Sequence, residues 1–160
     1  KKSAISVLLF KISINFIKHL YGKIMERTFT LIKPRAVQHN LLAPILQEIY
    51  KAGFRIKTIK TIQLNKAQAE KFYSVHNEKS FFQSLIEFMT SGPVFAIVLE
   101  KENAVENLRQ LMGNTDPEKA SEGTIRQKFG LDKQHNAIHG SDSKENAKKE
   151  IQFFFSEYEL

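Results

Sequence analysis

Residues 136–143 read Asn-Ala-Ile-His-Gly-Ser-Asp-Ser: a short apolar pair, one histidine and a Gly-Ser-Asp turn. Asp142, with Glu145 three residues later, has the spacing of a helix N-terminal capping box. A histidine at the end of a strand and followed by glycine has little side chain crowding it. Because an ordinary histidine is largely uncharged at pH 7, His139 can meet a phosphate with a ring-nitrogen lone pair. The stretch therefore predicts a strand, a turn and a helix around a nucleophilic histidine.

The composition suits one globular domain with a substantial core. The chain has 160 residues, of which 42% are hydrophobic, and no cysteine. The lack of cysteine excludes disulfides and thiolate metal sites and agrees with a reducing compartment, so we expect a cytoplasmic protein. Much of the net charge of +7 comes from five lysines in residues 1–24, which contain no acidic residue. We therefore expect no stable binding of nucleic acid by the body of the protein.

Residues 1–24 differ in character from the rest of the chain. Their apolar positions fit one helical face, but Lys11 interrupts them, so no transmembrane segment is expected. Three interpretations stay open: translated sequence upstream of a start at Met25, a targeting or membrane-surface helix, or a helix docked on the domain. We expect residues 25–160 to form the functional domain, without a contribution from residues 1–24 to the fold.

From Met25 onward the hydrophobic pattern alternates between strand and helix. Strands are expected at residues 27–32, 54–64, 94–99 and around His139, and helices at residues 42–52, 66–74, 80–90, 103–112 and 143–155. The alternation slips near Thr58-Ile59, which predicts a β-bulge. Residues 113–133 show little periodicity, as a functional or disordered loop does. This order predicts an α+β sandwich of the ferredoxin-like type, with a four-stranded antiparallel sheet covered by helices.

The chain resembles the nucleoside diphosphate kinase family in several motifs. Residues 136–143 are similar to the active-site signature of that family, and residues 27–34, Arg-Thr-Phe-Thr-Leu-Ile-Lys-Pro, to its first strand. Further matches, in the order and spacing of the family, are Phe81-Phe82, Ser91-Gly-Pro93, Arg109 with Met112-Gly-Asn-Thr-Asp-Pro117, and Gly123-Thr-Ile-Arg126. The resemblance covers residues 25–155.

The resemblance implies transfer of the γ-phosphoryl group from a nucleoside triphosphate to a nucleoside diphosphate by a ping-pong mechanism. A phosphohistidine would form on His139, and Glu150 would fix the other nitrogen of the ring. Ser141 would belong to the same network, and Tyr73 would lie near the transferred phosphate. Mg²⁺ would be carried by the nucleotide phosphates, so no protein metal site is expected.

The nucleotide-binding residues also follow from the resemblance, and each has a physical rationale. Lys33, Arg109 and Arg126 would place positive charge around the phosphate oxygens, because phosphoryl transfer depends on positioning and electrostatics. The hydroxyl of Thr115 would donate to a phosphate oxygen. Asn136 would bond the sugar 3′-hydroxyl, which Lys33 would also reach. Phe81 would stack on the base, and stacking accepts any base.

The sequence departs from the family at a few positions. Arg35-Ala36 follows Lys33-Pro34 where the family usually has Asp-Gly, which puts the packing of this loop in doubt. Lys133 stands where an apolar residue often lies near the base, and His135 replaces a commoner arginine. The resemblance implies a homo-oligomer and leaves tetramer and hexamer open.

Two other functions have to be weighed. An inactive, kinase-like scaffold or regulatory subunit should have lost His139, Lys33 or one of the arginines, and this chain has kept them. A nucleic-acid-binding module of the RRM kind should have a basic, aromatic strand pattern that no predicted strand shows. The sequence favours the enzyme.

Overall fold

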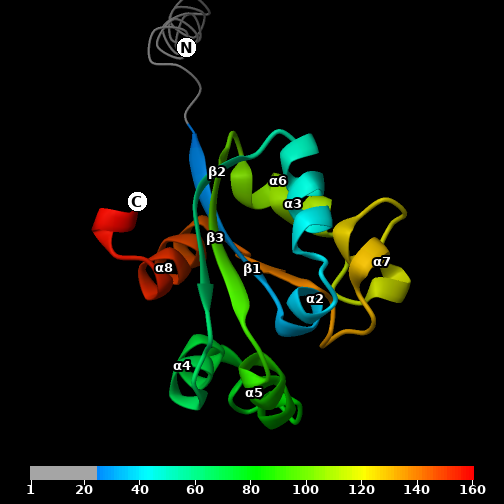
Figure 1. The fold of residues 1–160 in the computed structure, drawn as a ribbon, viewed down its shortest axis with the longest axis vertical. Helices are drawn as coiled ribbons and strands as arrows, with labels where there is room; N and C mark the ends of the chain where they lie inside the picture. The colour runs from blue at the N-terminus through cyan, green and yellow to red at the C-terminus, as the bar shows by residue number, and fades with distance from the viewer. Residues whose placement is uncertain (1–24) are drawn as a thin grey trace, which may run out of the picture.

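The structure, a computed structural model, describes residues 25–160, and its centre is a four-stranded antiparallel sheet. The strands are β1 (Glu26–Ile32), β2 (Arg55–Ile62), β3 (Val94–Lys101) and β4 (Ile138–Gly140). They lie in the order β2-β3-β1-β4 (Figure 1). All pairings are antiparallel, as predicted. The expectations for residues 1–24 lie outside the described residues.

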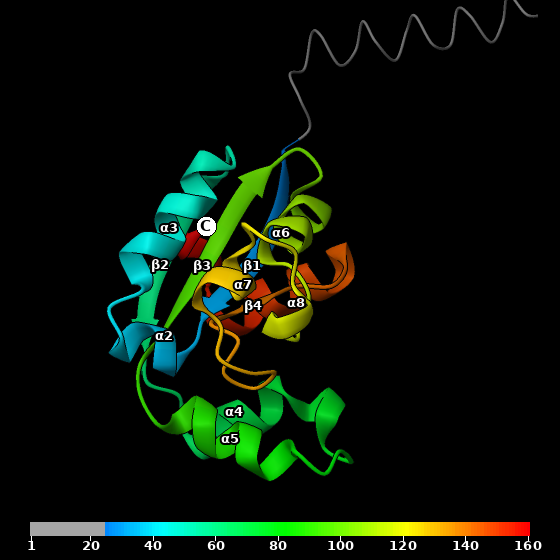
Figure 2. The same cartoon turned by 90° about the vertical axis from the view of Figure 1, so that its right-hand side faces the viewer.

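Helices cover both faces of this sheet. On one face lie α2 (Pro34–Gln38), α3 (Leu42–Lys51), α6 (Ala104–Met112) and α7 (Ile125–Phe129), and on the other α8 (Lys144–Phe154) (Figures 1 and 2). The hairpin of α4 (Lys66–Phe72) and α5 (Phe82–Thr90) lies at one end of the sheet (Figure 2). The succession β1-α3-β2-β3-α6-β4 in this strand order is the ferredoxin-like arrangement, which confirms the predicted fold class.

Each face of the sheet has its own hydrophobic core, because successive side chains of a strand point to opposite faces. On the α8 face, Phe29 and Leu31 of β1 pack with Ile151 and Phe154 of that helix and with α4 and α5. On the other face, Ile32 packs with buried residues of α3, α6 and α7. The central strand β3 is buried almost throughout, as its continuous apolar run predicted.

The predicted helices and strands are confirmed with small shifts of their ends. The slip expected near Thr58-Ile59 is a register shift between Ile56 and Thr58 in the β2–β3 pairing. Pro34 ends the region of β1 and occupies the first turn of α2, where its missing N–H costs no hydrogen bond. Gly53 follows α3 with a φ of 79°, a conformation that favours glycine.

Three local predictions are corrected by the structure. The predicted loop at residues 113–133 contains a 3₁₀ turn at Pro117–Lys119 and helix α7, whose five residues are too few to show a periodic pattern. Helix α2 was not predicted, for the same reason. The cap of α8 is Ser143 rather than Asp142, because the Ser143 hydroxyl accepts the bond from the main-chain N–H of Asn146.

Candidate functional site

An open cleft of about 770 Å³ lies between the α4–α5 hairpin, the α6–α7 region and β4. Eight of the ten predicted site residues line it: Lys33, Tyr73, Phe81, Arg109, Thr115, Arg126, Asn136 and His139. Of the other two, Glu150 contacts the His139 ring, and Ser141 contacts Glu150. The structure therefore brings all ten residues together around one cleft, although they are spread over residues 33–150 of the chain.

His139 is held in a defined orientation by Glu150. The ring Nε2 lies 3.0 Å from Oε1 of Glu150, a residue of α8, and the histidine side chain is 24% exposed. A carboxylate only accepts hydrogen bonds, so the proton of a neutral ring resides on Nε2 and the lone pair on Nδ1. The other carboxylate oxygen accepts a 2.5 Å bond from the hydroxyl of Ser141. The buried Ser141 thereby fixes the carboxylate that fixes the ring.

The main chain around His139 is fixed as well. Its carbonyl accepts a 2.6 Å bond from the hydroxyl of Thr30 in β1, and the carbonyl of Ile138 accepts a bond from Arg126. Ala137, just before β4, has a φ of 70°, and the N–H of Ile138 bonds the carbonyl of Asn136 across it. A γ-turn of this hand is rare and strained for a non-glycine residue. The strand that carries His139 thus begins at a strained turn between two hydrogen-bonded segments.

Lys33 and Asn136 form a buried polar pair at the base of the cleft. The Lys33 ammonium donates to Oδ1 of Asn136 at 2.7 Å and to the carbonyl of Gln134 at 3.1 Å. The Asn136 amide in turn donates to the carbonyl of Thr115. Burial, together with the charge of Arg126, lowers the pKa of Lys33 from 10.5 to about 7. An anion bound beside Lys33 would restore the charged form.

Arg126 and Arg109 add further positive charge to the same cleft. Arg126 donates to the carbonyls of Gly113 and Ile138, while its Nε is buried without a partner among the described residues. Burial and the neighbouring Arg109 lower the pKa of Arg126 to about 10. Three basic side chains around one cleft form a site for a multiply charged anion, whose charge they would offset.

Aromatic rings surround His139 and the mouth of the cleft. The rings of Phe72 and Tyr73 lie 5.4 and 6.2 Å from the His139 ring. The Tyr73 hydroxyl is buried without a hydrogen-bond partner in the described part of the chain, and burial together with Glu150 raises its pKa. Phe81 is 47% exposed at the start of α5. The ring of Phe81 is therefore partly exposed in the lining of the cleft.

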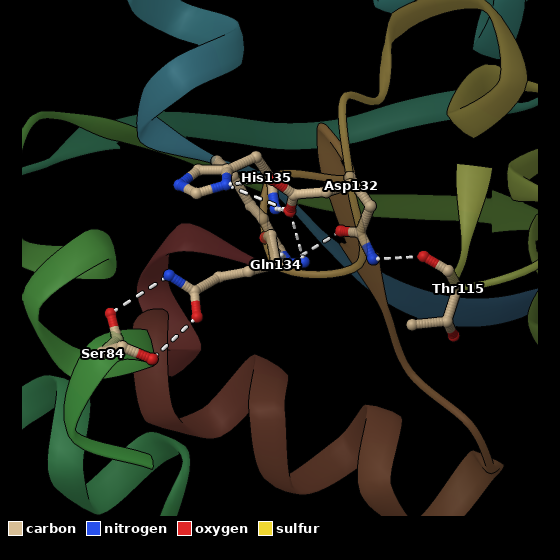
Figure 3. Close-up of polar contacts among 7 residues, drawn as sticks. Ser84, Thr115, Asp132, Gln134 and His135 are labelled. Atoms are coloured by element: carbon tan, nitrogen blue, oxygen red, sulfur yellow. Dashed lines mark hydrogen bonds and ion pairs between the residues drawn. The ribbon is translucent and has the colours of Figure 1, made fainter. Parts of the chain in front are cut away.

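Several lining residues were not predicted from the sequence. They are Leu85, Met112, Gly113, Asn114, Gln134, Gly140 and Asp142. His76 also lines the cleft, and burial and the charge of His139 lower its pKa. Gln134 pairs with Ser84 of α5, as Figure 3 shows. No local pattern signals such a pair, because its members are 50 residues apart.

No group of three or more His, Asp, Glu or Cys side chains within residues 25–160 is arranged to hold a metal ion. No helix in the same part of the chain has the length and apolar character needed to cross a bilayer.

The fold and the cleft define a class: a ferredoxin-like α+β protein with a basic cleft around an oriented histidine. Comparisons with known proteins narrow this class. The model of a family described as nucleoside diphosphate kinase matches residues 26–160. A nucleoside diphosphate kinase of Pasteurella multocida is 52% identical over 136 residues, which are 85% of this chain and 98% of that protein. One from Geobacter sulfurreducens is also 52% identical, with 85% and 99% covered.

Solved structures agree. The nucleoside diphosphate kinase of Aquifex aeolicus superimposes with a TM-score of 0.82 at 46% identity, covering 85% of this chain and 99% of that one. The Halobacterium salinarum enzyme, solved in complex with CDP, has a TM-score of 0.81 at 42% identity, with 84% and 90% covered. The chain belongs to the nucleoside diphosphate kinase family.

Proposed function

We propose that this protein transfers the γ-phosphoryl group of a nucleoside triphosphate, typically ATP, to a nucleoside diphosphate through a phosphohistidine on His139. Membership of the family supports the reaction. The observation that carries the assignment to His139 is its bond to Glu150, which leaves Nδ1 as the lone-pair nitrogen of a histidine lining a basic cleft.

In the first half-reaction, the Nδ1 lone pair of His139 attacks the γ-phosphorus. The bond from that phosphorus to the β–γ bridging oxygen breaks, and the nucleoside diphosphate leaves with the electron pair. In the second half-reaction, a β-phosphate oxygen of another nucleoside diphosphate attacks the phosphohistidine, and Nδ1 recovers its lone pair. Glu150 stabilises the positive charge that develops on the ring, because it accepts the Nε2–H bond throughout.

Lys33, Arg109 and Arg126 are proposed to hold the phosphate oxygens, with a further bond from the Thr115 hydroxyl. Their position in one cleft supports this role. Such fixed positive groups stabilise the charge on a transferring phosphoryl group with little reorganisation. The Tyr73 hydroxyl, which has no hydrogen-bond partner within residues 25–160, is proposed to donate to the transferred phosphate, which would give that buried group a partner.

Asn136 and Lys33 are proposed to bond the sugar, and Phe81 to stack on the base. Stacking supplies affinity without selecting one base, so we expect several nucleosides to be accepted. Mg²⁺ is proposed to enter with the nucleotide phosphates as part of the substrate, since this ion commonly binds substrate phosphates. Ser141 is proposed to act through Glu150 and not on the substrate, given its 2.5 Å bond to that carboxylate.

The remaining proposals concern the setting of the enzyme. We propose that residues 25–160 form the nucleoside diphosphate kinase-like domain, supported by a family match to residues 26–160. We further propose a homo-oligomer, tetramer or hexamer, and a cytoplasmic location, where the nucleotide substrates occur. No stable nucleic-acid complex is part of this proposal.

The alternative is an inactive, kinase-like scaffold or regulatory subunit. Against it stand the intact bond from His139 to Glu150 and the three cations of the cleft. A scaffold would not require a strained turn before His139 or a buried lysine with a lowered pKa.

A labelling experiment separates the two. The purified protein and His139→Ala are incubated with γ-labelled ATP and Mg²⁺ without an acceptor, and GDP or CDP is then added. We expect acid-labile, base-stable label on the wild-type protein only, discharged onto the diphosphate. A well-folded wild-type protein without label would support the scaffold.

A further inference from the structure

A pair of hydrogen bonds between Ser84 and Gln134 joins the two walls of the cleft beside Phe81. The Ser84 hydroxyl donates to Oε1 of Gln134 at 3.0 Å, and Nε2 of Gln134 donates to the main-chain carbonyl of Ser84 at 3.3 Å (Figure 3). Ser84 lies in α5, which begins directly after Phe81. Gln134 lies in the segment that leads to β4, and it lines the cleft. We call these two bonds the strap.

The main chain of Gln134 continues the connection toward the phosphate end of the cleft. Its carbonyl accepts a 3.1 Å bond from the Lys33 ammonium, which also donates to Asn136. One residue therefore contacts both the helix that follows Phe81 and the lysine at the base of the cleft. Gln134 therefore links the residues of the proposed base site to those of the proposed phosphate site.

Neither wall needs the strap for its own local structure. The main-chain N–H groups of Gln134 and His135 both donate to the carboxylate of Asp132, which fixes the turn before β4 (Figure 3). The Ser84 hydroxyl has a local alternative in the carbonyl of Phe81, 2.9 Å away. The strap thus adds only one constraint, which is the spacing between the two walls.

We infer that Gln134 is a positioning residue for nucleotide binding, which holds α5 and Phe81 at a fixed distance from Lys33. This inference rests on the proposed function. If the two walls of the cleft are already held at a fixed spacing, the protein loses less conformational entropy when the nucleotide binds between them. The strap therefore strengthens the binding of ligands that reach both ends of the cleft, and it leaves chemistry at His139 unaffected.

The test removes both bonds of the strap in one variant and only the hydroxyl bond in another. Gln134→Met retains the main-chain bond to Lys33 and a side chain of similar length, and Ser84→Ala removes the hydroxyl alone. We expect each to raise the Kd for ADP, measured by calorimetry, by about 3- to 10-fold, the effect of one or two neutral hydrogen bonds. The double variant should bind ADP as Gln134→Met does, because that change alone already removes both bonds.

Two matched variants control for changes in the helix itself. Gln83→Met alters the neighbouring residue of α5, whose exposed side chain bonds only Glu87 among residues 25–160. Ser84→Thr retains a hydroxyl at this position and should bind ADP with the wild-type Kd. Thermal unfolding of each variant establishes that it is folded.

Phosphoramidate, a phosphoryl donor without base or sugar, distinguishes positioning from damage to the reacting histidine. We expect it to label His139 at the wild-type rate in all strap variants. An unchanged Kd for ADP, additive effects in the double variant, or a parallel loss of phosphoramidate labelling would each overturn the inference. Failure of the wild-type protein to accept label from ATP would instead refute the proposed function.

Discussion

Nε2 of His139 lies 3.0 Å from Oε1 of Glu150, a contact between the shortest strand of the sheet and the helix that follows it. Because Ser141 holds the second carboxylate oxygen, the carboxylate cannot rotate away without losing that bond. The orientation of the ring is thus decided within one strand–turn–helix unit. Apart from Asn136, the residues that would hold the nucleotide come from elsewhere in the chain.

Glu150→Gln should slow phosphorylation of His139 while leaving the fold intact. The amide can still accept from Nε2–H, but it no longer provides a negative charge for a ring that becomes positive. The loss of a charged hydrogen-bond partner predicts a rate about 10- to 100-fold lower, measured in single turnovers with ATP. Glu145→Gln, an exposed acid in the first turn of the same helix, is the control and should retain the wild-type rate.

Nucleotide binding should take up a proton at Lys33. In the protein without nucleotide the pKa of Lys33 is about 7, so at pH 8 this side chain is largely neutral. A phosphate beside it favours the charged form. Uptake should approach about one proton at pH 8 and vanish below pH 6, and affinity for ADP should weaken as pH rises through 7. Calorimetry in buffers with different ionisation enthalpies measures the number of protons.

Lys33→Met provides the comparison for this measurement, because it removes the titrating group. The variant should bind ADP more weakly and show almost no proton uptake at pH 8. Equal uptake by the wild-type protein and the variant would mean that a group other than Lys33 takes up the proton. The first group to test would then be His76, which also lines the cleft.

Ala137 should tolerate glycine better than valine. Its φ of 70° is unstrained for glycine, whereas a β-branched residue is disfavoured there, and the site is only 2% exposed. We expect Ala137→Val to lower the free energy of unfolding by about 2 kcal/mol or more. Ala137→Gly should stay within about 1 kcal/mol of the wild-type value. Urea unfolding measures both, and a larger loss for glycine would contradict the strain argument.

Glu100 should stabilise the protein in a pH-dependent manner. It is buried at 4% exposure and accepts bonds from Arg27 and Arg55, so its folded pKa lies below 4.5 although burial alone would raise it. A depressed carboxyl pKa contributes stability that is fully present above the unfolded pKa and is lost as pH falls through the folded one.

The corresponding experiment compares Glu100→Gln with the wild-type protein across pH. We expect a loss of about 1–3 kcal/mol in the free energy of unfolding at pH 7, with the difference shrinking below about pH 4. Glu122→Gln, in an exposed loop, should change the free energy of unfolding little at any pH. A difference that persists unchanged at pH 3 would point to packing and not to the charge of Glu100.

The regular elements could be predicted because their hydrophobic patterns are long. The run at residues 94–99 and the helical face of residues 42–52 each contain enough apolar positions to exclude other periods, and both are confirmed by β3 and α3. Helices α2 and α7 were missed because five residues complete little more than one helical turn. The predicted cap of α8 was wrong by one residue, because Asp142 and Ser143 are both good capping residues.

By itself, the sequence determined the family and the identity of the candidate site residues, because motifs such as residues 136–143 keep their residue types and spacing along the chain. Only the tertiary structure decided which nitrogen of His139 is free, the lowered pKa of Lys33, the positive φ of Ala137 and the pairing of Ser84 with Gln134. The second and fourth of these depend on side chains that meet across long separations in the sequence, and the first depends on the packing of β4 against α8. The third is imposed on an ordinary alanine by hydrogen bonds to neighbouring segments. Burial, electrostatic environment and contact geometry exist only once the chain has folded.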